Sequence, residues 1–412
     1  MGFSGKNFYY KDYRNIVDYI YDFGDCSFDE VPFCDADNVV FSLLSYIEFE
    51  RFLKANDEFV PITVHEACVD YLSWMRIDFF TNDLSDWLRK TIFLAMALLK
   101  NKRFSQCKIT DFPVFFSHRK AEQFAGLRIE IADGTYVIAF RGTDTTLTGW
   151  EEDFNLACYP YTPGQKRALE FTRNCIRKYP RKKCRIMGHS KGGNFAVFAS
   201  ATLTEKEQKH IINVYSDDAP GCSAELYASE GHQRIKDRIV HIVPMDDIIG
   251  SLLHHEEISY VVAAEGFSDF MNQHDAFTWK MEGINFRRVP DTTPMSKYMA
   301  LSFNDLITKD LTQEDTISLV KIFTRTIKNT GYTSAITIFD SIPSFVLSFY
   351  ATANKGDKND KMVLKKAFKK IVSAFRAHFK EYVEFNNRQQ GQLQAARKED
   401  EISKAVLLEK NA

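Results

Sequence analysis

The chain has 412 residues, of which 45 % are hydrophobic and 26 % charged. This composition is ordinary for a globular protein and excludes global disorder and a coiled coil. The net charge of −2 argues against a general nucleic-acid-binding protein.

No secretory signal is visible from Met1 to Asp12, because no basic cluster precedes an apolar run there. The longest apolar runs, such as Thr91 to Leu99, are too short to cross a membrane. Without an export signal, the eight scattered cysteines predict reduced thiols instead of a disulfide framework or a zinc site. We therefore expect a cytoplasmic protein.

Residues 1–120 are expected to form a mainly helical N-terminal region. Asp83 to Asp86 offers N-cap side chains, and apolar residues follow at helical spacing from Trp87 to Leu99. The stretch from Phe112 to Phe116 predicts a short extended segment.

Residues 121–290 change period and are expected to form the catalytic core. Phe124 to Ala132 and Thr135 to Phe140 predict two strands, joined by the hairpin signal Asp133-Gly134. Beyond them, apolar strand-like runs alternate with helical sequence. The runs are Cys184 to Met187, Ile211 to Tyr215, Ile239 to Val243 and Ile258 to Ala264, and the helices are Gln165 to Tyr179 and Asn194 to Leu203. This alternation predicts an α/β fold with a mostly parallel sheet flanked by helices.

Residues 291–354 predict a helical C-terminal cover, and residues 355–412 a basic amphipathic tail. The tail holds 14 Lys or Arg against 8 Asp or Glu, a local charge of +6, which leaves −8 for the rest of the chain. Its apolar stripe comprises Leu364, Phe368, Ile371, Phe375, Phe379 and Tyr382. Such a tail could dock on an anionic membrane. The alternative, which the sequence favours, is that the stripe packs on the body while the lysines face water.

The strongest chemical signal is Gly188-His189-Ser190-Lys191-Gly192, between a short apolar strand and a helix. Glycines at this turn allow a sharp bend that exposes a nucleophilic serine, and the following helix aims N–H groups at a developing oxyanion. The alternative interpretation is a tight turn in which Ser190 only caps the helix.

A catalytic triad in the order Ser, Asp, His requires an acid and a histidine later in the chain. Asp246 and Asp247 follow the strand Ile239 to Val243, and His274 follows the run Ile258 to Ala264. We expect His274 to act as the base, although His254 and His255, on a predicted helix from Ile248 to Glu257, compete with it.

The acid is expected to be Asp247, with Asp246 as the alternative and the pair Asp217 and Asp218 as a third possibility. The oxyanion hole is expected from the backbone N–H groups of Thr143, after the strand ending at Phe140, and Lys191. No cofactor or metal is expected.

Three segments together resemble the lipase class 3 branch of α/β-hydrolases: Val137 to Asp144, Trp150 to Asn155 and Gly188 to Asn194. The sequence is most similar to a bacterial subgroup catalogued as a domain of unknown function. The segment Asp37 to Tyr46 resembles the N-terminal stretch of that subgroup. The resemblance covers residues 10 to 345 and implies the triad Ser190, Asp247 and His274. Lys191 departs from the leucine or glutamine of true lipases; such a cation could favour an anionic substrate or simply lie across the surface.

We therefore expect a serine hydrolase that cleaves a carboxylic ester, of a lipid or another small acyl compound, through an acyl-serine intermediate. Thioester or amide cleavage is a variant of this hypothesis. The alternative from another class is a non-catalytic binding protein on a hydrolase fold. No nucleic-acid partner is expected.

Overall fold

The computed structural model describes residues 13–75, 85–144, 146–266, 270–330 and 342–370, and beyond them residues 372, 373, 376, 379 and 383. No helix among these residues is both long enough and apolar enough to span a bilayer.

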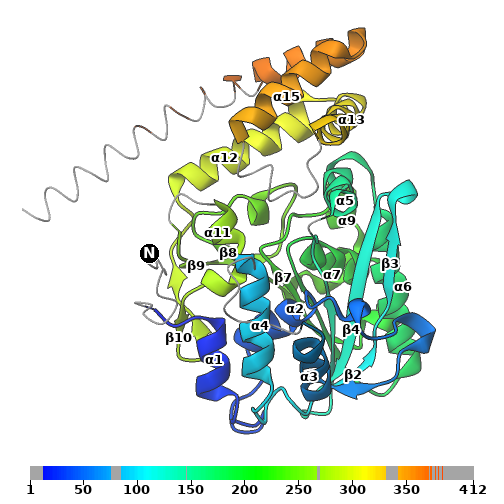
Figure 1. Ribbon diagram of the computed structural model, residues 1–412, viewed down its shortest axis with the longest axis vertical. Helices are drawn as coiled ribbons and strands as arrows, with labels where there is room; N and C mark the ends of the chain where they lie inside the picture. The colour runs from blue at the N-terminus through cyan, green and yellow to red at the C-terminus, as the bar shows by residue number, and fades with distance from the viewer. Residues whose placement is uncertain are drawn as a thin grey trace, which may run out of the picture.

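A large mixed sheet runs through the centre of the molecule (Figure 1). Its order is β1-β2-β4-β5-β6-β7-β8-β9-β12, and β3 pairs with β4 off this path. The strands are β1 (Ile62–Thr63), β2 (Lys108–Asp111), β3 (Val114–Ser117), β4 (Glu122–Glu130), β5 (Tyr136–Phe140), β6 (Cys184–His189), β7 (Ile211–Asp217), β8 (Ile239–Pro244), β9 (Ile258–Val262) and β12 (Arg288–Val289). A separate two-stranded sheet pairs β10 (Met281–Glu282) with β11 (Asn285–Phe286).

The core of the sheet is parallel, as predicted. Strands β5, β6, β7, β8 and β9 pair in parallel, so their carboxyl ends meet at one edge. The predicted hairpin is also confirmed: β4 and β5 pair antiparallel around Gly134, whose φ of +83° suits the turn. The antiparallel strands β1 and β2 belong to residues 1–120, the region predicted to be mainly helical. They add to the same sheet through β4, so the sheet continues past the predicted boundary at residue 120.

Helices cover both faces of the sheet. The helices of the described residues are α1 (Ile16–Phe23), α2 (Asp35–Leu44), α3 (Val64–Met75), α4 (Asp86–Leu98), α5 (Leu147–Cys158), α6 (Pro163–Lys178), α7 (Lys191–Thr202), α8 (Glu205–Gln208), α9 (Ala224–Tyr227), α10 (Glu230–Ile235), α11 (Phe270–His274), α12 (Pro294–Asp305), α13 (Gln313–Thr330) and α15 (Ile342–Lys355). Short 3₁₀ turns include η5 (Ile249–Ser251) and η6 (Ala276–Thr278), and α12 continues into the π-helical turn η7 (Leu306–Asp310).

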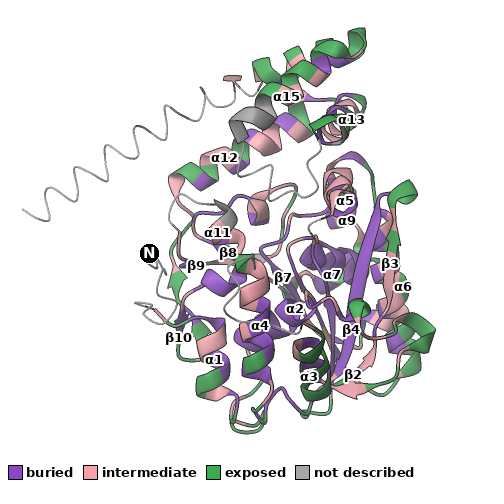
Figure 2. Cartoon of the chain, in the orientation of Figure 1, coloured by how far each residue is buried: buried purple, intermediate pink, exposed green. Residues whose placement is uncertain are grey.

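Alternate residues of β5 divide between two apolar cores. Val137 and Ala139 join the core under α1 to α4, whereas Tyr136, Ile138 and Phe140 join the core under α6 and α7. This alternation follows from the two-residue period of a strand. Both cores are almost wholly buried (Figure 2), so apolar side chains pack against the sheet on both of its faces.

The predicted helix from Ile248 to Glu257 does not form. The chain makes only the turn η5, and His254 then bridges to Cys222. The predicted N-cap is confirmed at Ser85, which accepts from the Leu88 N–H at the start of α4; Asp83 and Leu84 lie outside the described residues.

The C-terminal helices form a layer at one end of the long axis (Figure 1). Helix α13 packs on α5 and on α15, and Phe323 meets Phe154 edge to face with ring centroids 4.5 Å apart. The prediction that the tail stripe packs on the body is wrong at Phe368, which is 67 % exposed. Ile371, Phe375 and Tyr382 lie outside the described residues.

Candidate active site

Ser190 sits at a strained turn between β6 and α7. Its φ of 58° and ψ of −133° fall where few side chains are tolerated. Its hydroxyl does not cap the helix, which disfavours the interpretation of Ser190 as a capping residue. A Cβ at Gly188 would lie 2.3 Å from the Gly192 carbonyl carbon, and one at Gly192 would lie 2.2 Å from the Phe140 oxygen. Glycine is required at both positions because the helix start approaches the neighbouring strand so closely.

Two backbone N–H groups beside Ser190 have no acceptor within the described chain. They belong to Lys191, at the first position of α7, and to Thr143, in the loop after β5. By contrast, the N–H of Gly193 bonds the Ser190 carbonyl at 2.9 Å. These are the two donors predicted from the sequence, and both are available to an added oxygen atom.

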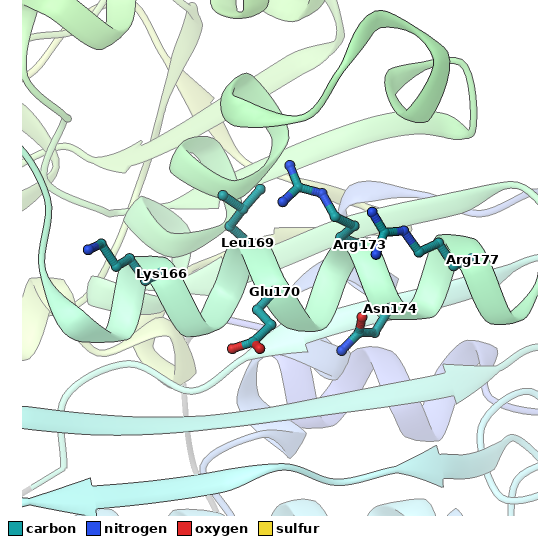
Figure 3. Close-up of a pocket in the computed structure, with 6 residues that line it drawn as sticks. All are labelled: Lys166, Leu169, Glu170, Arg173, Asn174 and Arg177. Carbon is teal, nitrogen blue, oxygen red and sulfur yellow. The ribbon is translucent and has the colours of Figure 1, made fainter.

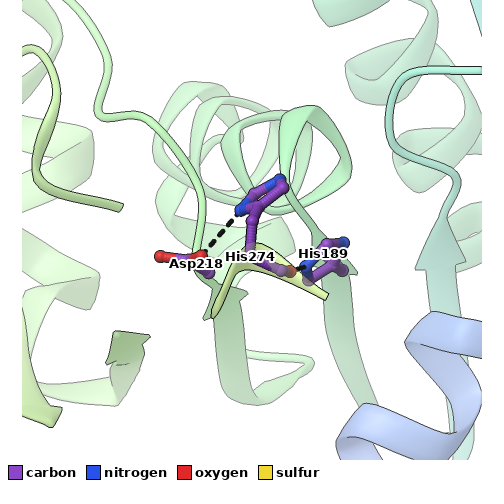
Figure 4. Close-up of side chains that lie close together, drawn as sticks. All are labelled: His189, Asp218 and His274. Carbon is purple, nitrogen blue, oxygen red and sulfur yellow. Dashed lines mark hydrogen bonds and ion pairs between the residues drawn. The ribbon is translucent and has the colours of Figure 1, made fainter. Parts of the chain in front are cut away.

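His274, at the end of α11, is held by an acid. Its Nδ1 lies 2.7 Å from Oδ2 of Asp218, a residue that directly follows β7 (Figure 4). Asp247, the acid that the sequence favoured, lies farther away, with its Oδ2 3.9 Å from the same nitrogen. The carboxylate of Asp246 accepts a hydrogen bond from the Thr293 hydroxyl. The structure therefore gives the direct hydrogen bond to the third of the acid candidates.

This hydrogen bond defines the tautomer of His274. Because a carboxylate only accepts, Nδ1 carries the proton and Nε2 presents a lone pair. Burial lowers the pKa of His274, so the neutral imidazole is favoured. Within the described residues, neither Nε2 nor the Ser190 hydroxyl makes a hydrogen bond. Hydrogen bonds between catalytic groups are often long before substrate binds.

Asp218 and Asp247 form a buried pair of carboxyl groups. Both side chains are fully buried, and the Gly250 N–H lies 3.1 Å from Oδ1 of Asp218 and 3.3 Å from Oδ2 of Asp247. Burial raises the pKa of both acids, and the charge of Asp218 raises that of Asp247 further. Oδ1 of Asp247 has no hydrogen-bond partner among the described residues. The hydrogen bonds from Asp247 and Gly250 lower the pKa of Asp218 against the effect of burial, so within the pair the charged form is favoured at Asp218 and the protonated form at Asp247.

His189 and Tyr46 support the site and were not predicted to do so. The His189 Nε2–H donates to the carbonyl oxygen of His274 at 2.7 Å, so its Nδ1 accepts from the Tyr46 hydroxyl at 2.9 Å. Burial holds the pKa of His189 well below its usual range, so the ring stays neutral. The side chain of His189 therefore anchors the backbone of His274.

Lys191 is neither a surface residue nor a free cation beside the serine. Its side chain is fully buried, and its Nζ lies 2.6 Å from Oε1 of Gln123 and 3.3 Å from Oε2 of Glu152. Both expectations for this residue are therefore wrong, because the helix turn directs the side chain into the core under α5.

The Thr143 hydroxyl donates to Oδ2 of Asp153 on α5 at 2.6 Å. Burial raises the pKa of Asp153 to about 6. The hydrogen bond fixes the loop that presents the Thr143 N–H.

The N-terminal segment Asp37 to Tyr46 supports the serine turn from below. Asn38 and Ser42 of α2 donate to the two carboxylate oxygens of Asp217, at 2.6 and 2.8 Å. The carbonyl oxygen of Asp217 in turn accepts from the Ser190 N–H at 2.8 Å. Burial raises the pKa of Asp217 to about 7. Asp217 is therefore part of the scaffold beneath the serine.

The competing histidines bind other partners. His254 Nε2 lies 3.2 Å from Glu256, and His255 Nε2 donates to the Leu252 carbonyl at 3.0 Å. His241 is buried between the Ser216 and Gly250 carbonyls. Of these histidines, none is bonded to an acid at the serine turn in the described part of the chain.

The ligand atoms of His189, Asp218 and His274 lie within 4.8 Å of one another, a spacing that could suit a metal ion. Their hydrogen bonds argue otherwise. Both nitrogens of His189 and Nδ1 of His274 are already engaged, so a metal would have to displace them. The geometry fits a proton-transfer chain better than a ligand set.

A surface hollow runs along α6, lined by Lys166, Leu169, Glu170, Arg173, Asn174 and Arg177 (Figure 3). Arg173 is paired there with Glu207 at 3.1 Å. None of its lining residues belongs to the candidate active site, so we assign it no part in the chemistry.

The parallel core, the helices on both faces and the strained serine turn define an α/β-hydrolase fold of the lipase-like type. The model of the Mbeg1-like family matches residues 98–324, which is more than half of the chain. The chain therefore belongs to the Mbeg1-like family, which is lipase class 3-like.

Among solved structures, the chain is similar to three fungal lipases. The Rhizomucor miehei lipase–propeptide complex has 16 % identity over 60 % of this chain and 80 % of that chain, with a TM-score of 0.35. Lipase II from Rhizopus niveus has 16 % identity over 42 % and 83 %, with a TM-score of 0.32. A triacylglycerol lipase from Penicillium expansum has 15 % identity over 45 % and 83 %, with a TM-score of 0.30. No curated protein matches the chain in sequence.

Proposed function

We propose that this protein is a serine hydrolase that cleaves a carboxylic ester through an acyl-serine intermediate. One observation carries the proposal: a buried carboxylate, Asp218, holds Nδ1 of His274 at 2.7 Å, and the ring of His274 lies 4.6 Å from that of His189, the residue before a serine at a strained turn. A scaffold protein would have no need to combine an acid-oriented neutral imidazole with a serine on a strained backbone turn.

In the first half of the reaction, the Ser190 oxygen attacks the ester carbonyl while Nε2 of His274 takes the hydroxyl proton. The tetrahedral intermediate then collapses, the bond between the acyl carbon and the leaving oxygen breaks, and the imidazolium returns the proton to the departing alkoxide. Water repeats these steps on the acyl-serine and releases the carboxylic acid. Asp218 stabilises the imidazolium throughout.

The N–H groups of Thr143 and Lys191 form the oxyanion hole in this proposal. Each lacks an acceptor within the described residues. Both belong to backbone that is already in position before substrate binds, so the protein need not rearrange when negative charge develops on the carbonyl oxygen. One such donor contributes about 3–4 kcal/mol to transition-state stabilisation. Asp153 acts through the Thr143 hydroxyl as a positioning residue.

We assign the orienting acid to Asp218 in place of Asp247 and Asp246. A direct hydrogen bond fixes both the tautomer and the ring orientation, which a carboxylate 3.9 Å away does less well. In this assignment Asp247 stays protonated and donates to Asp218. It is a positioning residue.

The substrate class is a neutral acyl or lipid ester. Lys191, the cation next to the nucleophile, is engaged with Gln123 and Glu152 and offers nothing to an anionic group at the reacting carbon. Thioester and amide cleavage would use the same groups and differ only in the leaving atom.

A fluorophosphonate probe tests the proposal, because it labels only an activated serine. We expect labelling of the wild type and none of Ser190→Ala. The matched control is Ser200→Ala on the same helix, which removes a buried hydroxyl that has no hydrogen-bond partner in the described structure; it should label like the wild type. A folded but unlabelled wild type would favour the binding-protein alternative, which the absence of a Ser190–His274 hydrogen bond among the described residues supports.

A further inference from the structure

The C-terminal helix beyond α15 has an unusual charge pattern. Residues 361–380 contain seven Lys or Arg and no Asp or Glu. Residues 358–370 are helical, and the helical positions 372, 373, 376, 379 and 383 continue this segment. Residues three or four apart share one face of a helix, so the exposure of each position identifies the inner and outer faces.

The inner face is apolar and electrically neutralised. Val363 and Ala367 are 1 % and 4 % exposed, and Leu306, Leu311 and Ala367 share one apolar cluster. The ion pairs of this face join Lys366 to Asp315, Lys370 to Asp310 and Arg325 to Asp360. The inner face therefore accounts for the packing of the helix on the C-terminal layer.

The outer face combines unpaired cations with large apolar side chains. Among the described residues, no ion pair is made by the exposed cations Lys358, Lys361, Lys365, Lys369 and Arg376. Between them lie Met362, Phe368 and Phe379, which are 60 %, 67 % and 58 % exposed. A helix that served only to cover the body would bury these aromatic rings, because exposing them to water costs free energy.

We propose that this outer face binds the surface of an anionic lipid bilayer. The apolar side chains would enter the boundary between headgroups and acyl chains, while the cations contact the lipid phosphates and carboxylates. Two complementary signals on one helix face are the pattern that stable peripheral binding requires. A neutral or basic partner would not match five exposed cations.

The position of this face agrees with such a role. The C-terminal layer stands at one end of the molecule, and α13 packs on α5, the helix that carries Asp153 (Figure 2). Docking there would hold the body away from the bilayer by the thickness of the helical layer. The proposal does not depend on catalysis by Ser190, because binding is measured separately.

Vesicle pelleting tests the proposal with the full chain. The vesicles contain phosphatidylcholine alone or with about one-third phosphatidylserine. We expect the wild type to pellet with the anionic vesicles, to remain largely soluble with the neutral ones, and to lose binding as salt is raised. Each cation near an anionic leaflet contributes about fivefold to partition. The triple variant Lys361→Glu, Lys365→Glu and Lys369→Glu should therefore lower partition by about 100-fold or more.

A control variant with the same change in net charge is Lys54→Glu, Lys206→Glu and Lys209→Glu, at exposed positions outside the C-terminal layer. It should bind like the wild type or within a few-fold of it. Phe368→Ser should weaken binding at every salt concentration, because it removes the apolar contribution. Circular dichroism checks that each variant is folded.

Equal pelleting of the wild type and the Lys361, Lys365 and Lys369 variant would overturn the proposal. So would wild-type pelleting that is the same with neutral and anionic vesicles. Retention of the wild type on heparin without any vesicle pelleting would instead assign the face to a soluble polyanion.

Discussion

Replacing Asp218 by Asn changes one atom in the hydrogen bond that orients His274. The carboxylate accepts from Nδ1–H at 2.7 Å, and the acid side chain is fully buried while the imidazole is 15 % exposed. An amide can donate its N–H to Nδ1, which moves the imidazole proton to Nε2 and removes the lone pair that would take the Ser190 proton. An equivalent change in a catalytic triad lowers kcat by about 10⁴-fold, or about 5.5 kcal/mol.

Asp247 limits how large this loss becomes. Its Oδ2 lies 3.9 Å from Nδ1, and without the charge of Asp218 it would ionise more readily. A carboxylate at that distance stabilises an imidazolium but does not fix its tautomer. We therefore expect Asp218→Asn to lower kcat/KM by about 10³- to 10⁴-fold, and Asp247→Asn to lower it by less than about tenfold.

The assay is steady-state hydrolysis of a short-chain p-nitrophenyl ester by purified variants, with fluorophosphonate labelling rates as a second readout. Thermal unfolding of each variant separates loss of activity from loss of structure. The assignment of Asp218 would be refuted if Asp247→Asn lowered kcat/KM more than Asp218→Asn did, and Asp218→Asn stayed within about tenfold of the wild type. Asp247, the acid favoured by the sequence, would then take its place.

Three further predictions concern the groups around this pair. Thr143→Val should lower kcat/KM by about 10- to 100-fold because it releases the oxyanion loop from Asp153, while Thr143→Ser keeps the hydroxyl and stays near the wild-type value; equal kinetics for both variants would contradict this. Glu152→Gln should lower the free energy of unfolding in urea by about 3 kcal/mol, because it leaves the buried Lys191 charge unpaired. The ratio of kcat/KM for anionic esters to kcat/KM for neutral esters should stay the same. A changed ratio would show that Lys191 contributes to substrate specificity. Asp247→Asn should raise Tm relative to the wild type at pH 8 and less at pH 5. The folded wild type retains a proton on Asp247 that the unfolded chain releases above about pH 4, so wild-type stability falls as pH rises, and a gain larger at pH 5 than at pH 8 would argue against the protonated carboxyl.

The parallel core was predictable because its strands are short apolar runs between helical segments. The serine turn was predictable because its two glycines are required. A Cβ atom at Gly188 or at Gly192 would lie only 2.3 or 2.2 Å from a neighbouring backbone atom. Both features are encoded locally, within a few residues of one another.

The acid could not be chosen from the sequence, because the chain places an Asp-Asp pair after each of two neighbouring parallel strands. Asp217 and Asp218 follow or end β7, and Asp246 and Asp247 follow β8, so all four reach the same sheet edge. Asp218 leaves the strand with a φ of +47°, a region that Asp tolerates better than most residues. The direction of the backbone at these four residues decides which carboxylate reaches His274. The amino-acid sequence does not reveal that direction.

The supporting contacts from the N-terminal region were hidden by distance along the chain. Asn38 and Ser42 lie 179 and 175 positions from Asp217, and no spacing rule connects them. The family resemblance did mark the segment Asp37 to Tyr46, but its physical role became clear only when α2 was seen beneath the serine turn. The outward rings of the tail were missed for a similar reason: a helical stripe shows which side chains share a face, but not whether that face meets the body.

The central claim is that Ser190 becomes acylated during turnover, and mass spectrometry of the quenched reaction tests it most directly. Wild-type protein mixed with a slowly hydrolysed ester should gain the mass of one acyl group, mapped to the peptide that contains Ser190, and the adduct should form far more slowly in His274→Ala. Continued ester hydrolysis by Ser190→Ala, or an adduct that maps to another nucleophile, would contradict the account.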